Sequence, residues 1–165
     1  MSEYLFEKVK EEHVSKLLEI YSYYIINTTA TFHCKVLTQA EMKELLIFSD
    51  ERYQSFVIMD KQNIIGYCIL THYSRREAFG RTGEITIYLR HDYTGRGIGN
   101  IAINYIEEVA KSKGFHVLLA LICGENSRSI SAFERNGYVK CALYKEVGYK
   151  FGRWLDMVAC QKIID

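Results

Sequence analysis

The chain has 165 residues, of which 48% are hydrophobic and 25% charged, and its formal net charge is +1. This length predicts a single domain over residues 1–165, and the near-neutral charge gives no reason to expect nucleic acid or an anionic membrane as a partner. No apolar run approaches the roughly 18 residues of a membrane span, and no signal-peptide pattern begins the chain, so a cytoplasmic protein is expected. The five cysteines are scattered and the histidines lack metal-ligand spacing, which predicts reduced thiols and no metal site.

The first half of the chain predicts a strand, two helices and a β-hairpin, in that order. The first helix should end near Asn27, where turn-forming and β-branched residues cluster. Thr38 and Glu41 have the spacing of a capping box, which begins the second helix. The predicted elements are a strand over 3–9, a helix from Glu11, a helix from Thr38 towards Phe48, and strands over 56–59 and 64–70.

The segment 83–114 is the most informative part of the chain. Its first residues alternate between apolar and polar, as in a strand with two different faces, and apolar residues then recur at helical spacing from Ile98 to Ala110. Between strand and helix stands Thr94-Gly95-Arg96-Gly97-Ile98-Gly99-Asn100. Glycines allow a ligand close to the backbone, and the helix start offers free N–H groups, so the loop predicts a phosphate site. From the residues alone, a glycine-rich turn that only begins a helix remains an alternative. Walker and dinucleotide-binding loops are excluded, because the glycine spacing differs from both.

The last third predicts a strand, a helix and two closing strands. Residues 116–122 form a nearly continuous apolar run, as expected of a strand buried on both faces. Asn126 can cap a helix that Gly137 ends, and the closing strands cover 139–147 and 154–163. The order β-α-α-β-β-β-α-β-α-β-β predicts an α/β (α+β) fold, with a mixed central sheet and helices on both faces.

The glycine-rich loop resembles the pyrophosphate loop of the GNAT N-acetyltransferases, Gln/Arg-x-x-Gly-x-Gly/Ala. Gly97 and Gly99 match its glycines, whereas Thr94 stands where Gln or Arg is usual. The predicted element order is also that of the GNAT fold. Four blocks, in the same order, are similar to the phosphinothricin acetyltransferase branch of that family: residues 27–32, 76–89, 126–138 and 147–156.

The resemblance implies direct transfer of an acetyl group from acetyl-CoA to the primary amine of a small amino-acid-like substrate, without a metal. In such enzymes the central strand splays from residues 117–122 to admit the coenzyme, and a backbone N–H near Leu89 can polarise the acetyl carbonyl. The coenzyme-binding residues implied are Ile87, Tyr88, Leu89, Gly95, Arg96, Gly97, Ile98, Gly99, Asn100, Asn126, Ser129 and Phe133.

Glu84 is the predicted general base for the amine. A glutamate on the central strand, sharing a face with Thr86 and Tyr88, is unfavourable unless that face borders a pocket. From the residues alone, a salt bridge from Glu84 to Arg76 or Arg81 remains an alternative.

The acceptor amine is expected to carry a carboxylate. Arg76 and Arg81 can bind this group, and Thr31 and Phe32 can line the same pocket. For each arginine, a solvated position in a loop remains an alternative. Phe133 occupies the position where the family has Tyr or His, so no general acid is assigned to the leaving thiolate. Tyr138 and Tyr144 both remain possible donors.

Two other functions stay open. One is acetylation of a protein N-terminus or a polyamine, although the basic segment 76–81 disfavours a polyamine. The other is a non-catalytic module that binds acetyl-CoA, which the presence of Glu84 disfavours. The C-terminal block, with Lys150, Arg153, Trp154 and Asp156, suits either a pocket wall or the contact of a homodimer. The sequence does not identify the acceptor.

Overall fold

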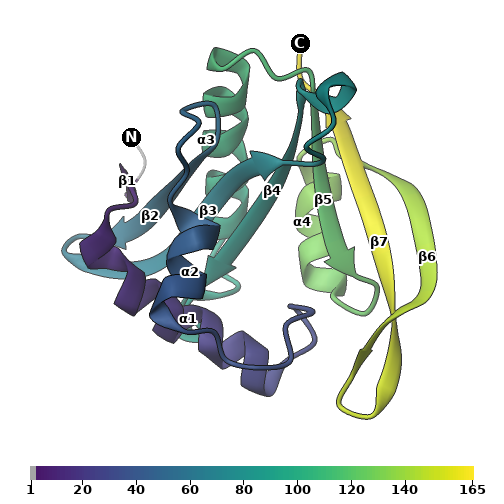
Figure 1. Cartoon of the computed structure of the whole chain (residues 1–165), viewed down its shortest axis with the longest axis horizontal. Coiled ribbons are helices and arrows are strands. Elements are labelled where there is room, and N and C mark those ends of the chain that lie inside the picture. Colours follow the sequence, from purple (N-terminus) through teal and green to yellow (C-terminus); the bar gives the residue numbers. More distant parts are fainter. Residues whose placement is uncertain (1–2) are drawn as a thin grey trace.

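The structure, a computed structural model, describes residues 3–165; residues 1 and 2 of the predicted domain lie outside the described residues (Figure 1). Seven strands form one sheet in the order β1-β2-β3-β4-β5-β7-β6, in which β4 and β5 run parallel and the other neighbours antiparallel. The strands are β1 (Leu5–Lys8), β2 (Gln54–Asp60), β3 (Asn63–His72), β4 (Thr82–Leu89), β5 (Val117–Cys123), β6 (Val139–Lys150) and β7 (Arg153–Ile163). The helices are α1 (Val14–Asn27), α2 (Gln39–Leu46), α3 (Ile98–Ser112) and α4 (Ser127–Arg135).

Helices cover both faces of the sheet, as predicted. In Figure 1, α1 and α2 lie in front of the sheet and α3 and α4 behind it. The side chains of β4 alternate between these layers: Ile85 packs with Ile103 and Ile106 of α3, whereas Tyr88 packs with the cluster under α1 and α2. The polar residues of β4 therefore face the α1–α2 side.

The sheet opens between β4 and β5. The two strands pair only over Thr82–Val117, Gly83–Leu118 and Glu84–Leu119, and beyond Glu84 they diverge in a V (Figure 1). β5 stays paired with β7 on its other side, so the opening has two free edges: β4 at residues 85–89 and β5 at residues 120–123. The predicted splay is thereby confirmed.

Several predicted boundaries differ from those of the structure: β1 is shorter than the predicted 3–9, and β2 and β3 are longer than the predicted 56–59 and 64–70. The first helix begins with a 3₁₀ turn, η1 (Glu11–His13), and the second ends at Leu46 because Ile47 leaves the helical region with φ −113°. The last two strands are longer than predicted. They meet in a two-residue turn at Phe151 and Gly152, both with positive φ. A phenylalanine in that conformation gives no turn signal in sequence, because hairpin turns of this kind favour Asn-Gly.

All five cysteines carry free thiols, three of them buried. Within residues 3–165, no helix is both long and apolar enough to cross a membrane.

Candidate active site

Two hollows meet where β4 and β5 separate. The first, which we call the groove, measures about 550 Å³ and runs along the free edge of β4 past loop 94–100 to α4. The second, which we call the cavity, measures about 980 Å³ and lies on the α1–α2 side of the sheet. The residues common to both linings form the junction: Ala30, Thr86, Tyr88 and Leu121. A ligand in the groove can therefore meet a ligand in the cavity.

The free edge of β4 offers main-chain hydrogen-bonding groups to the groove. The N–H of Arg90 donates to Ile65 of β3 at 2.7 Å, so it points away from the groove. Main-chain groups alternate sides along a strand, so the amides of Leu89 and Ile87 point into it. An extended ligand can add to this edge as another strand would. Ile87 lies between the junction residues Thr86 and Tyr88, so its amide is nearer the junction than that of Leu89.

The glycine-rich loop leaves the start of α3 open. Gly95 and Gly97 have φ of +77° and +78°, a conformation that favours glycine. Apart from the glycine itself, its chain neighbours and the nearby backbone of α3, no atom of residues 3–165 lies within 4 Å of the point where a Cβ on Gly95, Gly97 or Gly99 would stand. Gly97 is the N-cap of α3 and supplies no side-chain cap. The first N–H groups of α3 can therefore bind an anion.

The predicted coenzyme residues converge on the groove, with two exceptions. Arg96 turns away: its guanidinium donates to the Asp92 carbonyl at 2.9 Å and lies 4.6 Å from the Tyr93 ring centre. The Ile98 side chain is fully buried in the core. Neither side chain reaches the groove, so only their main chain remains available for binding. The others line the groove: Ile87, Tyr88, Leu89, Gly95, Gly97, Gly99, Asn100, Asn126, Ser129 and Phe133.

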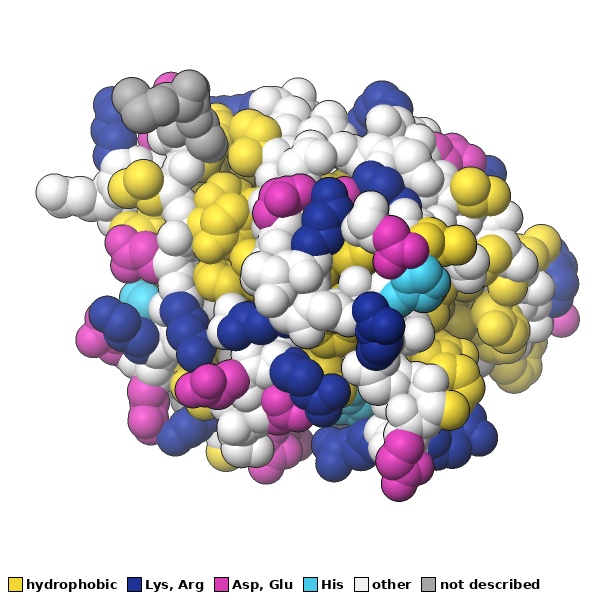
Figure 2. Space-filling model, turned by 90° about the horizontal axis from the view of Figure 1, so that it is seen from above, with side chains coloured by type: hydrophobic (Ala, Val, Ile, Leu, Met, Phe, Trp, Pro, Cys, Tyr) yellow, Lys and Arg dark blue, Asp and Glu magenta, His cyan; other side chains and the backbone are white. Residues whose placement is uncertain are grey.

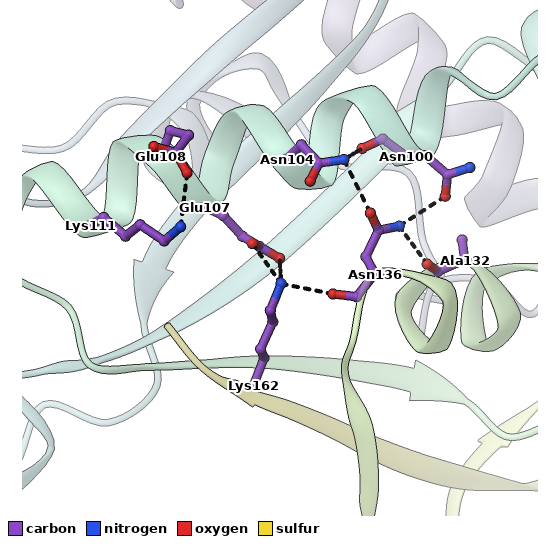
Figure 3. Close-up of polar contacts among 8 residues, drawn as sticks. All are labelled: Asn100, Asn104, Glu107, Glu108, Lys111, Ala132, Asn136 and Lys162. Atoms are coloured by element: carbon purple, nitrogen blue, oxygen red, sulfur yellow. Dashed lines mark hydrogen bonds and ion pairs between the residues drawn. The ribbon is translucent and has the colours of Figure 1, made fainter. Parts of the chain in front are cut away.

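A polar network joins the two helices that border the groove (Figure 3). The buried Glu107 of α3 pairs with Lys162 of β7 at 2.8 Å, and Lys162 also donates to the Asn136 carbonyl. The Asn136 amide donates to Asn100 Oδ1 at 2.9 Å and to the Ala132 carbonyl at 2.7 Å. Because Asn100 and Ala132 line the groove, these bonds fix its width at the α3 end.

Glu84 lies in the wall of the cavity with its carboxylate unpaired. No hydrogen bond or ion pair to it occurs within residues 3–165, so the alternative salt bridge to Arg76 or Arg81 is absent from the described chain. Burial raises the pKa of Glu84 above that of an ordinary glutamate. A carboxylate in this state accepts a proton more readily than a solvated one.

The structure separates the two arginines predicted for the acceptor. Arg76 lines the cavity, but Arg81 does not: its Nε donates to the Gly114 carbonyl at 3.0 Å, beyond the end of α3. The structure therefore does not place Arg81 in the predicted acceptor site; its hydrogen bond to Gly114 gives it a structural role instead. Thr31 and Phe32 both line the cavity, as predicted, and the Phe32 ring lies against Gly148 of β6.

Several residues around the cavity and groove escape sequence reasoning. Arg75 lines the cavity and has no ion-pair partner among residues 3–165. Tyr21 and His33 border the cavity from α1 and the loop after it, and Arg128 borders the groove. No spacing marks these residues, because distant segments bring them together. Of these residues, only Arg75 could have been found from the sequence, because it is next to Arg76, which was predicted to bind the acceptor.

The two tyrosines considered as proton donors lie elsewhere. Neither Tyr138 nor Tyr144 lines the groove or the cavity. The buried Tyr138 hydroxyl has no hydrogen-bond partner in the described chain, and burial, followed by the neighbouring Glu107, raises its pKa. Tyr144 is exposed on β6.

The loop after α1 forms a roof over the junction and is tied down from three sides. Tyr88 donates to the Ala30 carbonyl at 3.1 Å, and the buried Lys150 donates to the Thr31 carbonyl at 2.9 Å. Glu125 accepts from Thr29 and forms a two-pronged pair with Arg153, both distances being 2.7 Å. The hydrogen bonds from Arg153 and Thr29 lower the pKa of Glu125 to about 2.

Metal ligands do not gather around this site. Within residues 3–165, no group of three or more His, Cys, Asp or Glu side chains is arranged to hold a metal ion.

Comparison with known proteins identifies the family of this arrangement. The sequence model of the acetyltransferase (GNAT) domain matches residues 7–159. The chain is 30% identical to the phosphinothricin N-acetyltransferase of Streptomyces coelicolor, over 89% of this chain and 88% of that protein. It is 31% identical to the L-methionine sulfoximine/L-methionine sulfone acetyltransferase of Pseudomonas aeruginosa, over 90% of this chain and 88% of that protein.

A solved structure resembles the whole fold. The GNAT superfamily phosphinothricin acetyltransferase of Sinorhizobium meliloti, in complex with AcCoA, superposes with a TM-score of 0.91 at 26% identity. The match covers 99% of this chain and 89% of that one.

Proposed function

The chain belongs to the GNAT acetyltransferase family, and from that premise we propose that it acetylates the primary amine of a small amino-acid-like substrate, of the phosphinothricin or methionine sulfoximine type. Membership of the family makes the chain an acetyl-CoA-dependent N-acetyltransferase. The observation that carries the choice of acceptor is the cavity beside the groove, with the unpaired Glu84 in its wall and Arg75 and Arg76 in its lining.

Acetyl-CoA fits the groove by its chemistry. The diphosphate meets the open N–H groups of loop 94–100 and the start of α3, and its negative charge suits the positive end of that helix. The pantetheine arm, which carries amides, adds to the edge of β4 at Ile87 and Leu89. The acetyl group then reaches the junction, where the Ile87 amide donates to its carbonyl oxygen as negative charge develops there.

The acceptor enters from the cavity, and its amine attacks the thioester carbonyl directly, without an acyl-enzyme intermediate. Glu84 removes the proton that the ammonium must lose before it can attack, directly or through a water. Arg76 and Arg75 bind the substrate carboxylate, and Thr31 and Phe32 enclose the remainder. Three arginines and four carboxylates border the cavity, so the preference for an amino-acid-like acceptor over a polyamine rests on the likeness to the two relatives.

A thiol-release assay tests this proposal. The protein is mixed with acetyl-CoA and, in turn, phosphinothricin, methionine sulfoximine, methionine and spermidine, and free coenzyme A thiol is measured. Amino-acid-like acceptors should release thiol well above the no-acceptor rate, and spermidine should not. If thiol release with the amino-acid-like acceptors stays at background, the proposed acceptor is wrong.

We also infer that two copies of the chain associate through β6 and β7. Hydrophobic side chains gather at the edge of the molecule formed by these strands, on the right of Figure 2. More than half of each of these side chains is exposed: Val139, Leu143, Val147, Tyr149, Phe151 and Trp154. Exposed apolar patches of this kind favour protein–protein contact. Light scattering should give the mass of a dimer, and Trp154→Glu should give that of a monomer; a monomeric wild-type protein would exclude the contact.

A further inference from the structure

Acetyl transfer releases a thiolate, and the position usual for its proton donor is held by Phe133, which has no proton to give. Tyr138 and Tyr144 lie outside the groove and cavity. A donor must therefore come from a residue at the junction itself. Of the four junction residues, only Thr86 and Tyr88 carry a hydroxyl. A phenol is by far the more acidic of these two groups.

Tyr88 belongs to a cluster of hydroxyl groups on the α1–α2 side. Its ring packs against that of Tyr21, with ring centres 5.0 Å apart, and its hydroxyl donates to the Ala30 carbonyl at 3.1 Å. The Tyr21 hydroxyl lies 2.6 Å from Thr31 Oγ1 and also forms a short hydrogen bond with Nδ1 of His33. All five of these residues line the cavity.

The cluster leads from the junction to solvent. Tyr88 and Tyr21 are largely enclosed, whereas His33 is exposed. Histidine is the side chain that takes up and releases protons most readily near neutral pH. A hydroxyl group can accept one proton and pass on another, so Tyr21, which is hydrogen-bonded to His33 and packs against Tyr88, can carry a proton inward.

We propose that Tyr88 is the general acid of the reaction and that Tyr21 and His33 return its proton. The assignment rests on the proposed function, because it concerns the thiolate of that reaction. When the tetrahedral intermediate collapses, the C–S bond breaks and its electron pair goes to sulfur. The O–H proton of Tyr88, which the Ala30 carbonyl accepts in the resting structure, leaves that carbonyl, moves to sulfur and forms the thiol. Tyr88 then takes a proton from Tyr21, which takes one from the His33 imidazolium, and His33 is protonated again by solvent.

The surroundings of Tyr88 explain why a return path is needed. Burial, followed by the neighbouring Tyr21, raises the pKa of Tyr88, so its anion is unfavourable in this position. The anion must be reprotonated as it forms. The return path begins at Tyr21, whose ring packs against that of Tyr88.

The test compares single-turnover rates at saturating acetyl-CoA for Tyr88→Phe and a matched control. Tyr105→Phe also removes one hydroxyl from a partly buried tyrosine, but Tyr105 packs on Phe6 and Phe56, away from the groove and cavity. Tyr88→Phe should lower the rate about 100-fold, in line with loss of a general acid. Its Kd for acetyl-CoA, measured by calorimetry, should change less than about twofold, and its solvent deuterium isotope effect should fall towards one.

The path that returns a proton to Tyr88 is tested separately, by the single-turnover rates of variants at Tyr21 and His33. Tyr21→Phe and His33→Ala should each lower the rate about tenfold, and the double variant should be no slower than either single one, because both cut the same path. Added imidazole should restore His33→Ala but not Tyr21→Phe or Tyr88→Phe. A purely structural role of His33 would not respond to imidazole.

Three outcomes separate the assignments. If Tyr88→Phe keeps the rate and isotope effect of Tyr105→Phe while the wild-type protein turns over, Tyr88 is not the acid, and the proposed function still stands. If Tyr88→Phe is slow but imidazole leaves His33→Ala unchanged, the return path through His33 is wrong. If the wild-type protein releases no thiol with any amine, the proposed function itself fails.

Discussion

The groove and the cavity are built from different parts of the chain. The groove takes its main-chain groups from one stretch, residues 85–100, and α4 closes its other side. The cavity takes side chains from segments as far apart as Tyr21 and Met157. Main-chain amides bind whatever anion fits them, so the groove tolerates variation such as Thr94 at the first loop position. The cavity depends on side-chain identity, and there a single replacement can change the acceptor.

The largest expected effect lies in the cavity. Glu84→Gln keeps the shape of the side chain but removes the base, so kcat should fall by about 10²–10⁴, while the Kd for acetyl-CoA should stay within about twofold. Glu108→Gln is the control, because Glu108 pairs with Lys111 on the exposed face of α3. Steady-state kinetics and calorimetry measure the two quantities. Turnover within a few-fold of wild type would remove Glu84 from the role of base.

The matching change in the groove is Gly97→Glu. It should weaken acetyl-CoA binding by about 100-fold or more, because the new carboxylate occupies the open loop and repels the diphosphate. Gly114→Glu is a close control: Gly114 has φ +79° and open space as well, but lies beyond the other end of α3. The two variants should lose similar stability, while only Gly97→Glu loses binding. Equal loss of binding in both would mean that strain, and not the site, is responsible.

The pH dependence sharpens the role of Glu84. Since burial raises its pKa, the acidic limb of kcat/KM should lie above 4.5, the ordinary value for this group, and fall about tenfold per pH unit below it. A carboxyl with a raised pKa stabilises the fold below its unfolded value and loses that contribution as pH rises. Glu84→Gln should therefore unfold no more easily than wild type at pH 7. A pH–rate profile measures the acidic limb of kcat/KM. A limb at or below pH 4.5 would contradict the raised pKa of Glu84.

A smaller effect distinguishes Arg76 from Arg81. Arg76→Gln should raise the KM of the acceptor about tenfold, equivalent to about 1.5 kcal/mol for a charged hydrogen bond, and leave the KM of acetyl-CoA unchanged. Arg81→Gln should change neither, because Arg81 bonds to Gly114 outside the cavity. If both variants raised the acceptor KM alike, Arg81 would belong to the site after all.

The smallest effect concerns the roof of the junction. Glu125 and Arg153 are both well exposed, so Glu125→Gln should lower the free energy of unfolding by no more than about 1 kcal/mol at pH 7. The pKa of Glu125 is lowered from 4.5 to about 2, so its contribution is present above pH 4.5 and is lost as pH falls through about 2. Denaturation at several pH values measures this. A loss of several kcal/mol would mean that the pair does more than secure the loop.

Much of the fold follows from short-range patterns in the sequence. The alternation before Leu89, the helical spacing after Gly97 and the capping box at Thr38 each predict an element that the structure contains. The predicted ends of helices and strands are wrong where the local sequence carries few capping or turn-forming residues. The turn at Phe151 and Gly152 lacks the residues that such turns favour, so the last two strands are longer than predicted.

By itself, the sequence determined the family, the order of elements and the loop that can bind a diphosphate. All of these depend on residues close together in the chain, whose spacing fixes main-chain conformation. The tertiary structure decided that Arg81 faces away from the cavity, that Glu84 is left unpaired, and that Tyr21, His33 and Tyr88 form one cluster. These facts depend on strand register, on the divergence of β4 from β5 and on the path of the loop after α1. Such features arise from packing between distant segments, and no local spacing records them.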